Sequence, residues 1–280
     1  MKLTPVVLKK EVQTPVAKPF LKWAGGKSQL VTEILNRFPI QFNRYFEPFL
    51  GGGAVFFALT PKKAILSDIN QELVTTYQAI RDNVGFVVRE LQKHKVDENY
   101  FYWVREKDPT KLNQAKIAAR MIYLNRTCFN GLYRVNKRGR FNVPYGHYEN
   151  PTVCNEENLL RVTDILTHTQ IEHRHAFEIA KHARAGDLVY LDPPYQPLSK
   201  TSSFTSYTIN GFTEQDQKDL ANIFRWLAKK GVSVVLSNSD TPLIREIYKG
   251  FRVEEVYARR AINSKADRRG KVSELLICSK

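Results

Sequence analysis

The tetrapeptide Asp192-Pro193-Pro194-Tyr195 follows a continuous apolar run and combines residue types that can do chemistry. Two adjacent prolines lack backbone donors and fix two φ angles, so a rigid turn is expected. That turn would hold the Asp192 carboxylate and the Pro193 carbonyl as acceptors for the two N–H groups of an exocyclic amine on a nucleobase. An amine held in this way points its nitrogen lone pair at an electrophile, so positioning supplies much of the rate acceleration. The ring of Tyr195 can stack on an extruded base. The plain alternative is a structural turn with an exposed tyrosine.

Two further features lie where predicted strands end. Gly51-Gly52-Gly53 follows one apolar strand and opens a helix, and glycine permits positive φ and a close backbone approach to a nucleoside. It matches neither GxGxxG nor a P-loop, and a tight strand-helix turn is the alternative. Asp68 ends the next strand, where an acid can accept hydrogen bonds from ribose hydroxyls. The alternative for Asp68 is the N-cap of the helix that starts near Asn70.

The segment FLKWAGGK (20–27) precedes the first predicted strand. Trp23 could cover a ligand, and Lys27 could lie near a carboxylate. By itself, the segment fits equally well a loop with an anchored tryptophan.

The elements that must position these residues alternate between strand and helix. Buried strands are expected within 45–53, 64–70, 187–195 and 232–240, and helices after Gly53 and over 71–91 and 214–230. This order predicts an α/β fold with a doubly wound, mostly parallel sheet, which binds ligands beyond the carboxyl ends of its strands. Residues 1–18 are expected to form a flexible leader.

The alternation stops in the middle of the chain, which predicts an inserted, mainly helical domain with a β-hairpin over 92–175. The catalytic domain would then comprise 19–91 and 176–280. Within 101–150, ten Lys or Arg oppose three acids, and the whole chain carries a formal net charge of +15. Basic residues that neutralise phosphates release counterions, so this charge favours a polyanionic partner over a merely solvated basic surface.

Other classes are excluded by the sequence. No apolar run approaches the length of a membrane-spanning helix or a signal-peptide core. The three cysteines are widely spaced without a CxxC pair, so we expect a reducing, cytoplasmic compartment. No metal is expected, because His and carboxylates form no cluster with ligand spacing, and a monomer is expected by default.

The chain resembles the Dam family of DNA adenine methyltransferases over nearly all of residues 18–280. The family's α-group order, with the glycine motif first, then the recognition domain and then DPPY, is kept. Six segments carry the resemblance: FLKWAGGK (20–27), FEPFLGGGAVFF (46–57), ILSDIN (65–70), YLNRTCFNGLYRVNKRGRFNVPYG (123–146), VYLDPPYQPLS (189–199) and RRAINS with RGKVSELL (within 259–276). The glycine motif reads GGG where FxGxG is commoner.

The resemblance implies methyl transfer from S-adenosylmethionine to the N6 amine of adenine in double-stranded GATC, by base flipping and direct in-line attack. Its catalytic residues would be Asp192, Pro193 and Tyr195. The implied contacts to S-adenosylmethionine come from Trp23, Lys27, Phe49, Gly51, Gly53, Asp68 and Asp192. The implied contacts to DNA come from Lys22, Phe129, Asn130, Arg134, Asn136, Arg138, Pro144 and Tyr148.

Two DNA-side roles are more specific. Arg134 occupies the position that pairs with a guanine, and Arg suits the bidentate contact to its major-groove edge. Phe129 and Asn130 match the pair that enters the duplex where the adenine has left. The family usually has Tyr in place of Phe129, so a core aromatic is the alternative there. His147 stands where Arg is common. The run from Arg259 to Lys271 has six basic residues and one acid, which favours an arm that orders on DNA phosphate over the alternative of a solvated loop.

Two other functions remain open from the sequence. Methylation of RNA or of a cytosine amine would use the same motif, and a DNA-binding protein without turnover would use the same basic surface. The sequence leaves open a role in mismatch repair and replication control or in a restriction-modification system.

Overall fold

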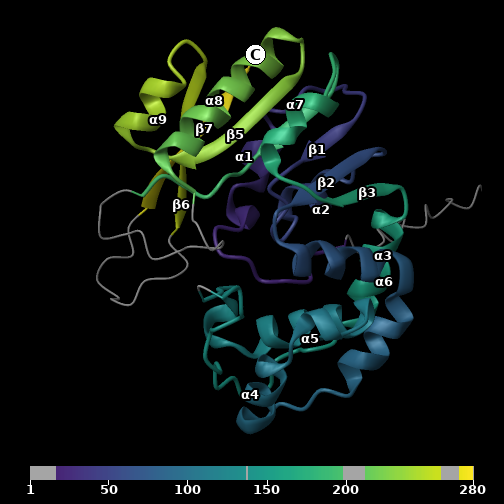
Figure 1. The fold of residues 1–280 in the computed structure, drawn as a ribbon. Coiled ribbons are helices and arrows are strands. Elements are labelled where there is room, and N and C mark those ends of the chain that lie inside the picture. The colour runs from purple at the N-terminus through teal and green to yellow at the C-terminus, as the bar shows by residue number, and fades with distance from the viewer. Residues whose placement is uncertain (1–16, 137, 198–211, 260–270, 280) are drawn as a thin grey trace, which may run out of the picture.

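The computed structural model describes residues 17–136, 138–197, 212–259 and 271–279. A seven-stranded sheet forms the upper part of the molecule in Figure 1, with strand order β3-β2-β1-β4-β5-β7-β6. The first five strands of that order pair in parallel, and β7 is antiparallel to both neighbours. The strands are β1 (Tyr45–Glu47), β2 (Ala64–Asp68), β3 (Thr169–His173), β4 (Leu188–Leu191), β5 (Ser233–Ser239), β6 (Arg252–Arg259) and β7 (Lys271–Cys278).

Side chains alternate along the strands between two buried clusters, so both faces of the sheet are covered. Tyr45 and Tyr190 belong to one cluster, whereas the adjacent Phe46 and Leu191 belong to the other. The second cluster includes residues of α7 (Ile179–His182), α8 (Glu214–Lys229) and α9 (Pro242–Ile247). The first includes residues of α1 (Val31–Leu35), α2 (Ala54–Leu59), α3 (Gln71–Gln92), α5 (Gln114–Thr127) and α6 (Glu156–Leu166). The expected doubly wound, mostly parallel fold is confirmed.

Local sequence explains where the elements begin and end. β1 is shorter than the apolar run predicts, because Pro48 follows Glu47 and has no N–H for the ladder. Helix α3 begins at an Asn70 cap, whose side chain accepts a hydrogen bond from Leu73 N. A capping box between Thr213 and Asp216 starts α8.

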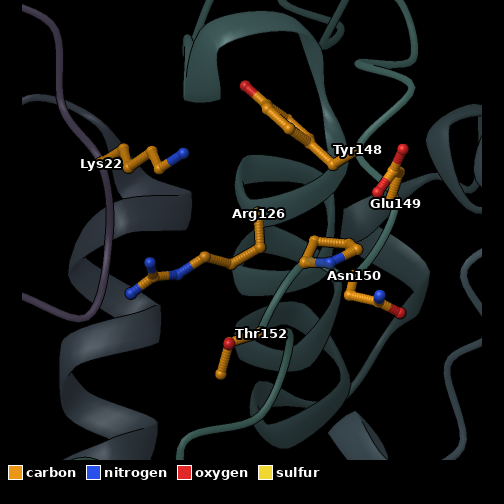
Figure 2. Close-up of a pocket in the computed structure, with 7 residues that line it drawn as sticks. Lys22, Arg126, Tyr148, Glu149, Asn150 and Thr152 are labelled. Carbon is orange, nitrogen blue, oxygen red and sulfur yellow. The ribbon is translucent and has the colours of Figure 1, made fainter.

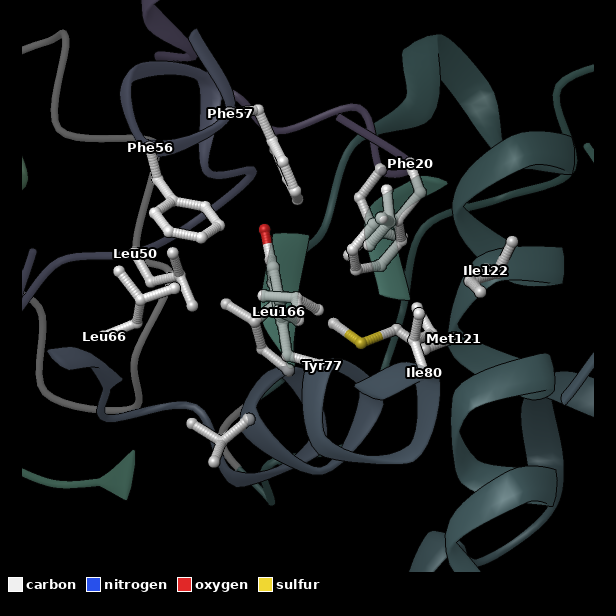
Figure 3. Packing of buried hydrophobic residues seen from close by; sticks show 14 of the residues in the cluster. Phe20, Leu50, Phe56, Phe57, Leu66, Tyr77, Ile80, Met121, Ile122 and Leu166 are labelled. Atoms are coloured by element: carbon white, nitrogen blue, oxygen red, sulfur yellow. The ribbon is translucent and has the colours of Figure 1, made fainter. Parts of the chain in front are cut away.

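The first cluster continues from the sheet into the lower part of the molecule. Figure 3 shows Phe56 and Phe57 of α2 packed near Tyr77 of α3, with Met121 of α5 on the far side. The Thr76 hydroxyl lies 3.2 Å from Met121 Sδ. The sheet and α5 therefore share one continuous apolar core.

Helices α4 (Glu98–Glu106) and α5 lie below α3 in Figure 1, away from the sheet. Arg120 of α5, 4% exposed, joins them through an ion pair of 2.7 Å to Glu72 of α3. It also donates to the carbonyls of Val104 and Arg105 at the end of α4. One buried guanidinium thus ties three helices.

The hairpin within the middle segment is short. An isolated bridge pairs Val135 with Phe141, and Asn142 N donates to Arg134 O across it. Gly139 N closes the turn on Asn136 O.

Two findings bear on the predicted boundaries. β3 falls inside the range assigned to the insertion, yet it pairs in parallel with β2 and forms an edge of the sheet. Ala17 and Lys18, assigned to the leader, are packed: Ala17 is buried, and the Lys18 backbone is hydrogen-bonded to the Asn158 side chain. Residues 1–16 lie outside the described ranges, as do 260–270 of the basic C-terminal run.

Candidate active site and DNA-reading surface

An ion pair joins the FLKWAGGK segment, which precedes β1, to the Asp-Pro-Pro-Tyr turn, which follows β4. Lys27, in the short 3-10 helix η1 (Lys27–Gln29), places Nζ 2.9 Å from Asp192 Oδ1 just after β4. The same ammonium donates to the Gly25 carbonyl and lies 4.6 Å from the centroid of the Tyr195 ring. The expectation that Lys27 lies near a carboxylate is met by Asp192.

Burial is the main influence on the Asp192 carboxyl. It raises the pKa of Asp192 to about 6, while the positive charge of Lys27 lowers this pKa and the negative charge of Glu274 raises it. The carboxyl is therefore ionised at neutral pH and loses its charge in mildly acidic solution.

The Asp-Pro-Pro-Tyr turn is held from behind by buried amides that the sequence analysis missed. Gln217 of α8 donates to Pro194 O at 2.9 Å, and Asn238 of β5 donates to Gln217 Oε1 at 3.0 Å. Asn238 Oδ1 accepts from Gln196 N at 3.2 Å. Both amide side chains are fully buried, so the turn is fixed by a satisfied polar network.

Tyr195 is oriented by a residue from the far end of the chain. Its hydroxyl donates to Glu274 Oε2 of β7 at 2.6 Å. Since β7 lies beside β5 in the sheet, this contact depends on the strand order and not on sequence spacing. The ring is thereby fixed beside the Lys27–Asp192 pair.

The glycine turn and Asp68 form one unit at the ends of β1 and β2. Gly51 and Gly53 adopt φ angles of +49° and +67°, which favour glycine. Asp68 accepts hydrogen bonds from Gly51 N at 3.1 Å and Asn70 N at 2.9 Å. The N-cap alternative for Asp68 is wrong, because the Asn70 side chain caps α3. Burial raises the pKa of Asp68.

Trp23 lies against this turn. A Cβ on Gly51 would come within 2.7 Å of Trp23 Cδ1, so the missing side chain makes room for the indole. On its other side, Trp23 stacks on Tyr133 with ring centroids 5.2 Å apart. The indole therefore connects the glycine turn to the middle segment.

Phe49 belongs to an aromatic group near the same strand ends. Its ring meets Phe212 edge-on at 6.0 Å, and Phe212 meets Phe177 at 6.2 Å. Phe177 follows β3 and was not predicted as part of this site. The TQIEH sequence of β3 carries only a weak apolar pattern.

The predicted DNA-side residues are gathered on loops of the middle segment. Phe129 and Asn130 form the exposed tip of the 3-10 turn η3 (Phe129–Gly131), and Phe129 N donates to Pro144 O at 2.9 Å. Phe129 is 51% exposed, so the alternative of a core aromatic is wrong. Asn130 has a φ of +55°, which fixes this tip in a left-handed bend.

In the hairpin, the exposed Arg134 donates through Nε to Asn142 Oδ1 at 2.8 Å. Asn136 is a turn residue, because its Oδ1 accepts from Arg138 N and Arg140 N. The Arg138 side chain is exposed.

A pocket of about 300 Å³ adjoins this surface and is lined by Lys22, Arg126, Tyr148, Glu149, Asn150, Pro151 and Thr152. Figure 2 shows Lys22 and Arg126 extending into the space between the N-terminal segment and α5. Lys22 Nζ lies 5.0 Å from the Tyr148 ring centroid. The structure thus brings together two residues predicted to contact bases.

Over the described ranges, no helix is long and apolar enough to cross a membrane. No group of three or more His, Cys, Asp or Glu side chains suited to a metal ion occurs in the same part of the chain.

Comparison with known proteins identifies the family of this chain. Residues 23–262 match the family model of D12 class N6 adenine-specific DNA methyltransferases. A Type II methyltransferase of Lactococcus lactis subsp. cremoris is 42% identical, covering 93% of this chain and 94% of its own. The DNA adenine methylase of Serratia marcescens is 39% identical, covering 92% and 97%.

Among solved structures, an rRNA methyltransferase from Streptomyces viridochromogenes matches 99% of this chain and 91% of its own, with 16% sequence identity and a TM-score of 0.38. A TM-score this low carries no argument about function. The chain belongs to the D12 class of N6 adenine-specific DNA methyltransferases.

Proposed function

We propose that this enzyme transfers a methyl group from S-adenosylmethionine to the N6 amine of adenine in double-stranded GATC, after flipping the adenine out of the helix. The observation that carries the proposal is the Lys27–Asp192 pair beside the Tyr195 ring, next to the glycine turn. This arrangement offers a carboxylate, an aromatic face and a glycine turn in one place.

The residues at the strand ends fit S-adenosylmethionine chemically. Asp68 is a half-buried carboxylate suited to ribose hydroxyls, and the Lys27 ammonium suits the carboxylate of the methionine part. Trp23, Phe49, Gly51 and Gly53 complete the proposed site. S-adenosylmethionine supplies an electrophilic methyl group bound to a sulfonium.

Asp192 and Pro193 act on the adenine. Lys27 Nζ holds Asp192 Oδ1 at 2.9 Å, and the carboxylate has further lone pairs that can accept from the N6 amine. With Pro193 O as a second acceptor, the amine's lone pair is directed outward, and its nitrogen forms the N–C bond as the C–S bond breaks. The bonding pair of the broken C–S bond stays on sulfur, so S-adenosylhomocysteine leaves, and the methylated amine loses one proton to solvent. Because the amine attacks the methyl group directly, no covalent enzyme intermediate is needed. Tyr195 stacks on the adenine.

The middle segment reads the duplex. Arg134 contacts the guanine edge, and Phe129 and Asn130 occupy the space that the adenine leaves. Lys22, Pro144 and Tyr148 make further base contacts, while Asn136 shapes the hairpin turn that carries Arg138 toward the backbone. The exposure of Phe129, Asn130 and Arg134 supports this assignment.

The test is methyl transfer from labelled S-adenosylmethionine to duplexes that contain GATC or GATC with one base changed. Transfer to GATC alone, recovered as N6-methyladenine, is expected. Equal transfer to both duplexes would support adenine methylation and overturn the proposed GATC specificity. Transfer to RNA or to cytosine instead would overturn the proposed substrate.

We propose further that the enzyme works in the cytoplasm of a bacterium or as a phage-encoded enzyme in such a host. The free thiols of Cys128, Cys154 and Cys278 support a reducing compartment.

A further inference from the structure

One buried asparagine bonds two segments that carry different parts of the site. Asn125 of α5 is 1% exposed. Its Oδ1 accepts from Lys22 N at 2.8 Å, and its Nδ2 donates to Lys22 O at 2.8 Å and to Gly131 O at 3.0 Å. A single side-chain amide thus pairs with the backbone of Lys22 as a neighbouring strand would, and it also holds the η3 turn.

Close packing reinforces the link between those two segments. Gly131 has a φ of +62°, and a Cβ there would come within 2.8 Å of Lys22 Cβ. The stem of Lys22 therefore lies directly on the turn whose exposed tip is Phe129 and Asn130. Movement of that tip cannot leave Lys22 unaffected, since packed atoms transmit displacement.

The segment leads from Lys22 to the catalytic pair in five residues. Trp23 follows at once, lies against Gly51 and accepts a hydrogen bond at its carbonyl from Gly26 N, 3.0 Å away. Lys27 then donates to Gly25 O and pairs with Asp192. Each step of this path is fixed by a hydrogen bond or a packed ring.

We propose that Asn125 is a positioning residue that couples target reading at the η3 turn to the placement of Lys27 beside Asp192. Correct insertion of Phe129 and Asn130 into the duplex fixes the position of the Gly131 carbonyl, which is hydrogen-bonded to Asn125. Asn125 in turn holds the backbone of Lys22. The segment from Trp23 to Lys27 then places the Lys27 ammonium beside Asp192. Sequence discrimination is then expressed in the rate of methyl transfer as well as in binding. This inference rests on the proposed sequence-specific function.

The chain contains a matched control for this clamp. Asn158 of α6, 7% exposed, makes the same bidentate pair with Lys18: Lys18 N donates to Oδ1 and Nδ2 donates to Lys18 O, both at 2.9 Å. It holds the same N-terminal segment four residues earlier. In the described structure its side chain makes no hydrogen bond to the η3 turn. Loss of Asn158 therefore loosens the segment without cutting the path from the DNA.

The experiment compares wild type, Asn125→Ala and Asn158→Ala in single-turnover methylation at saturating DNA and S-adenosylmethionine. The substrates are the GATC duplex and a duplex with one base changed. For Asn125→Ala we expect the rate on GATC, divided by the rate on the changed duplex, to fall. The reason is that the rate on GATC should drop about 100-fold when the reacting groups are misplaced. Asn158→Ala should keep the wild-type ratio and lose only thermal stability.

Asn125→Asp is the second variant in case Asn125→Ala does not fold, because it keeps the side-chain volume and the acceptor for Lys22 N while losing both donated bonds. A folded Asn125 variant with the wild-type ratio would overturn the coupling, as would an equal loss of the ratio in Asn158→Ala. If wild type itself shows no preference for GATC, the proposed specificity is overturned together with the coupling. A preference in wild type that Asn125→Ala retains overturns the coupling alone.

Discussion

Lys27 Nζ lies 2.9 Å from Asp192 Oδ1, which places the end of the N-terminal motif against the turn after β4. The pair keeps a buried carboxylate ionised at neutral pH next to an aromatic face. Asp192→Ala is expected to abolish methyl transfer, because it removes the carboxylate that pairs with Lys27 and accepts from the adenine amine. Labelled methyl transfer measures the loss, and a circular dichroism spectrum checks the fold. Normal turnover in this variant would remove Asp192 from the mechanism.

The pH dependence of the rate should report the Asp192 carboxyl. Its pKa of about 6 predicts that turnover falls as the pH drops through that value, since protonation removes the negative charge and part of the acceptor capacity that the amine needs. Lys27 lowers this pKa, so Lys27→Met should move the acidic limb to higher pH. Glu274 raises it, so Glu274→Gln should move the limb to lower pH.

These shifts are measured as kcat against pH at saturating S-adenosylmethionine and DNA. The two substitutions serve as each other's control, because one removes a positive charge and the other a negative charge. Shifts of both variants in the same direction would contradict the assignment of the acidic limb to Asp192.

The Tyr195 ring and its hydroxyl have separable roles. Tyr195→Phe removes the donor to Glu274 Oε2 and leaves a partly buried carboxylate without this partner, at a cost of about 1–3 kcal/mol of unfolding free energy. The ring remains, so most of kcat should remain. Tyr195→Ala removes the stacking face, worth about 1–3 kcal/mol per base, and kcat should fall far more. Equal kcat values in the two variants would contradict a stacking role.

The amides behind the turn should matter for rate without touching substrate. Gln217→Leu removes the donor to Pro194 O and the acceptor for Asn238 Nδ2, which should cost about 1–3 kcal/mol in stability per buried group. The displaced turn should lower kcat while S-adenosylmethionine binding stays unchanged. Gln215→Leu on the exposed side of α8 is the control and should lie within about 0.5 kcal/mol of wild type. Thermal unfolding and single-turnover rates provide both readouts.

Strong local patterns made much of the fold predictable. The expected helices over 71–91 and 214–230 correspond to α3 and α8 within a residue or two, and the apolar runs became β1, β2, β4 and β5. β3 was not recognised, because its TQIEH sequence lies at a sheet edge with few apolar positions to show a period.

The site residues that stand within a sequence motif were predictable, whereas those brought to the site by packing of distant elements were not. Asp192, Lys27 and Asp68 stand in motifs whose residue types already indicate ligands. Glu274 and Gln217 reach the turn only because β7 and α8 both lie beside β5, an arrangement that spacing in the sequence does not encode. The stacking of Trp23 on Tyr133 has the same origin.

Arg134 should contribute to specificity rather than to general affinity. Its exposed guanidinium is steadied by Asn142, which preorganises it for a bidentate contact to one guanine. Arg134→Ala should lose about 1–3 kcal/mol on GATC and little on a duplex already changed at that guanine, so discrimination at this one position relaxes. Arg138→Ala is the matched control on the same hairpin, because loss of a phosphate contact should weaken all duplexes alike and reduce the salt dependence of binding. Binding and methylation measured across single-base variants of GATC distinguish the two patterns, and a uniform loss in Arg134→Ala would assign that residue to the DNA backbone instead.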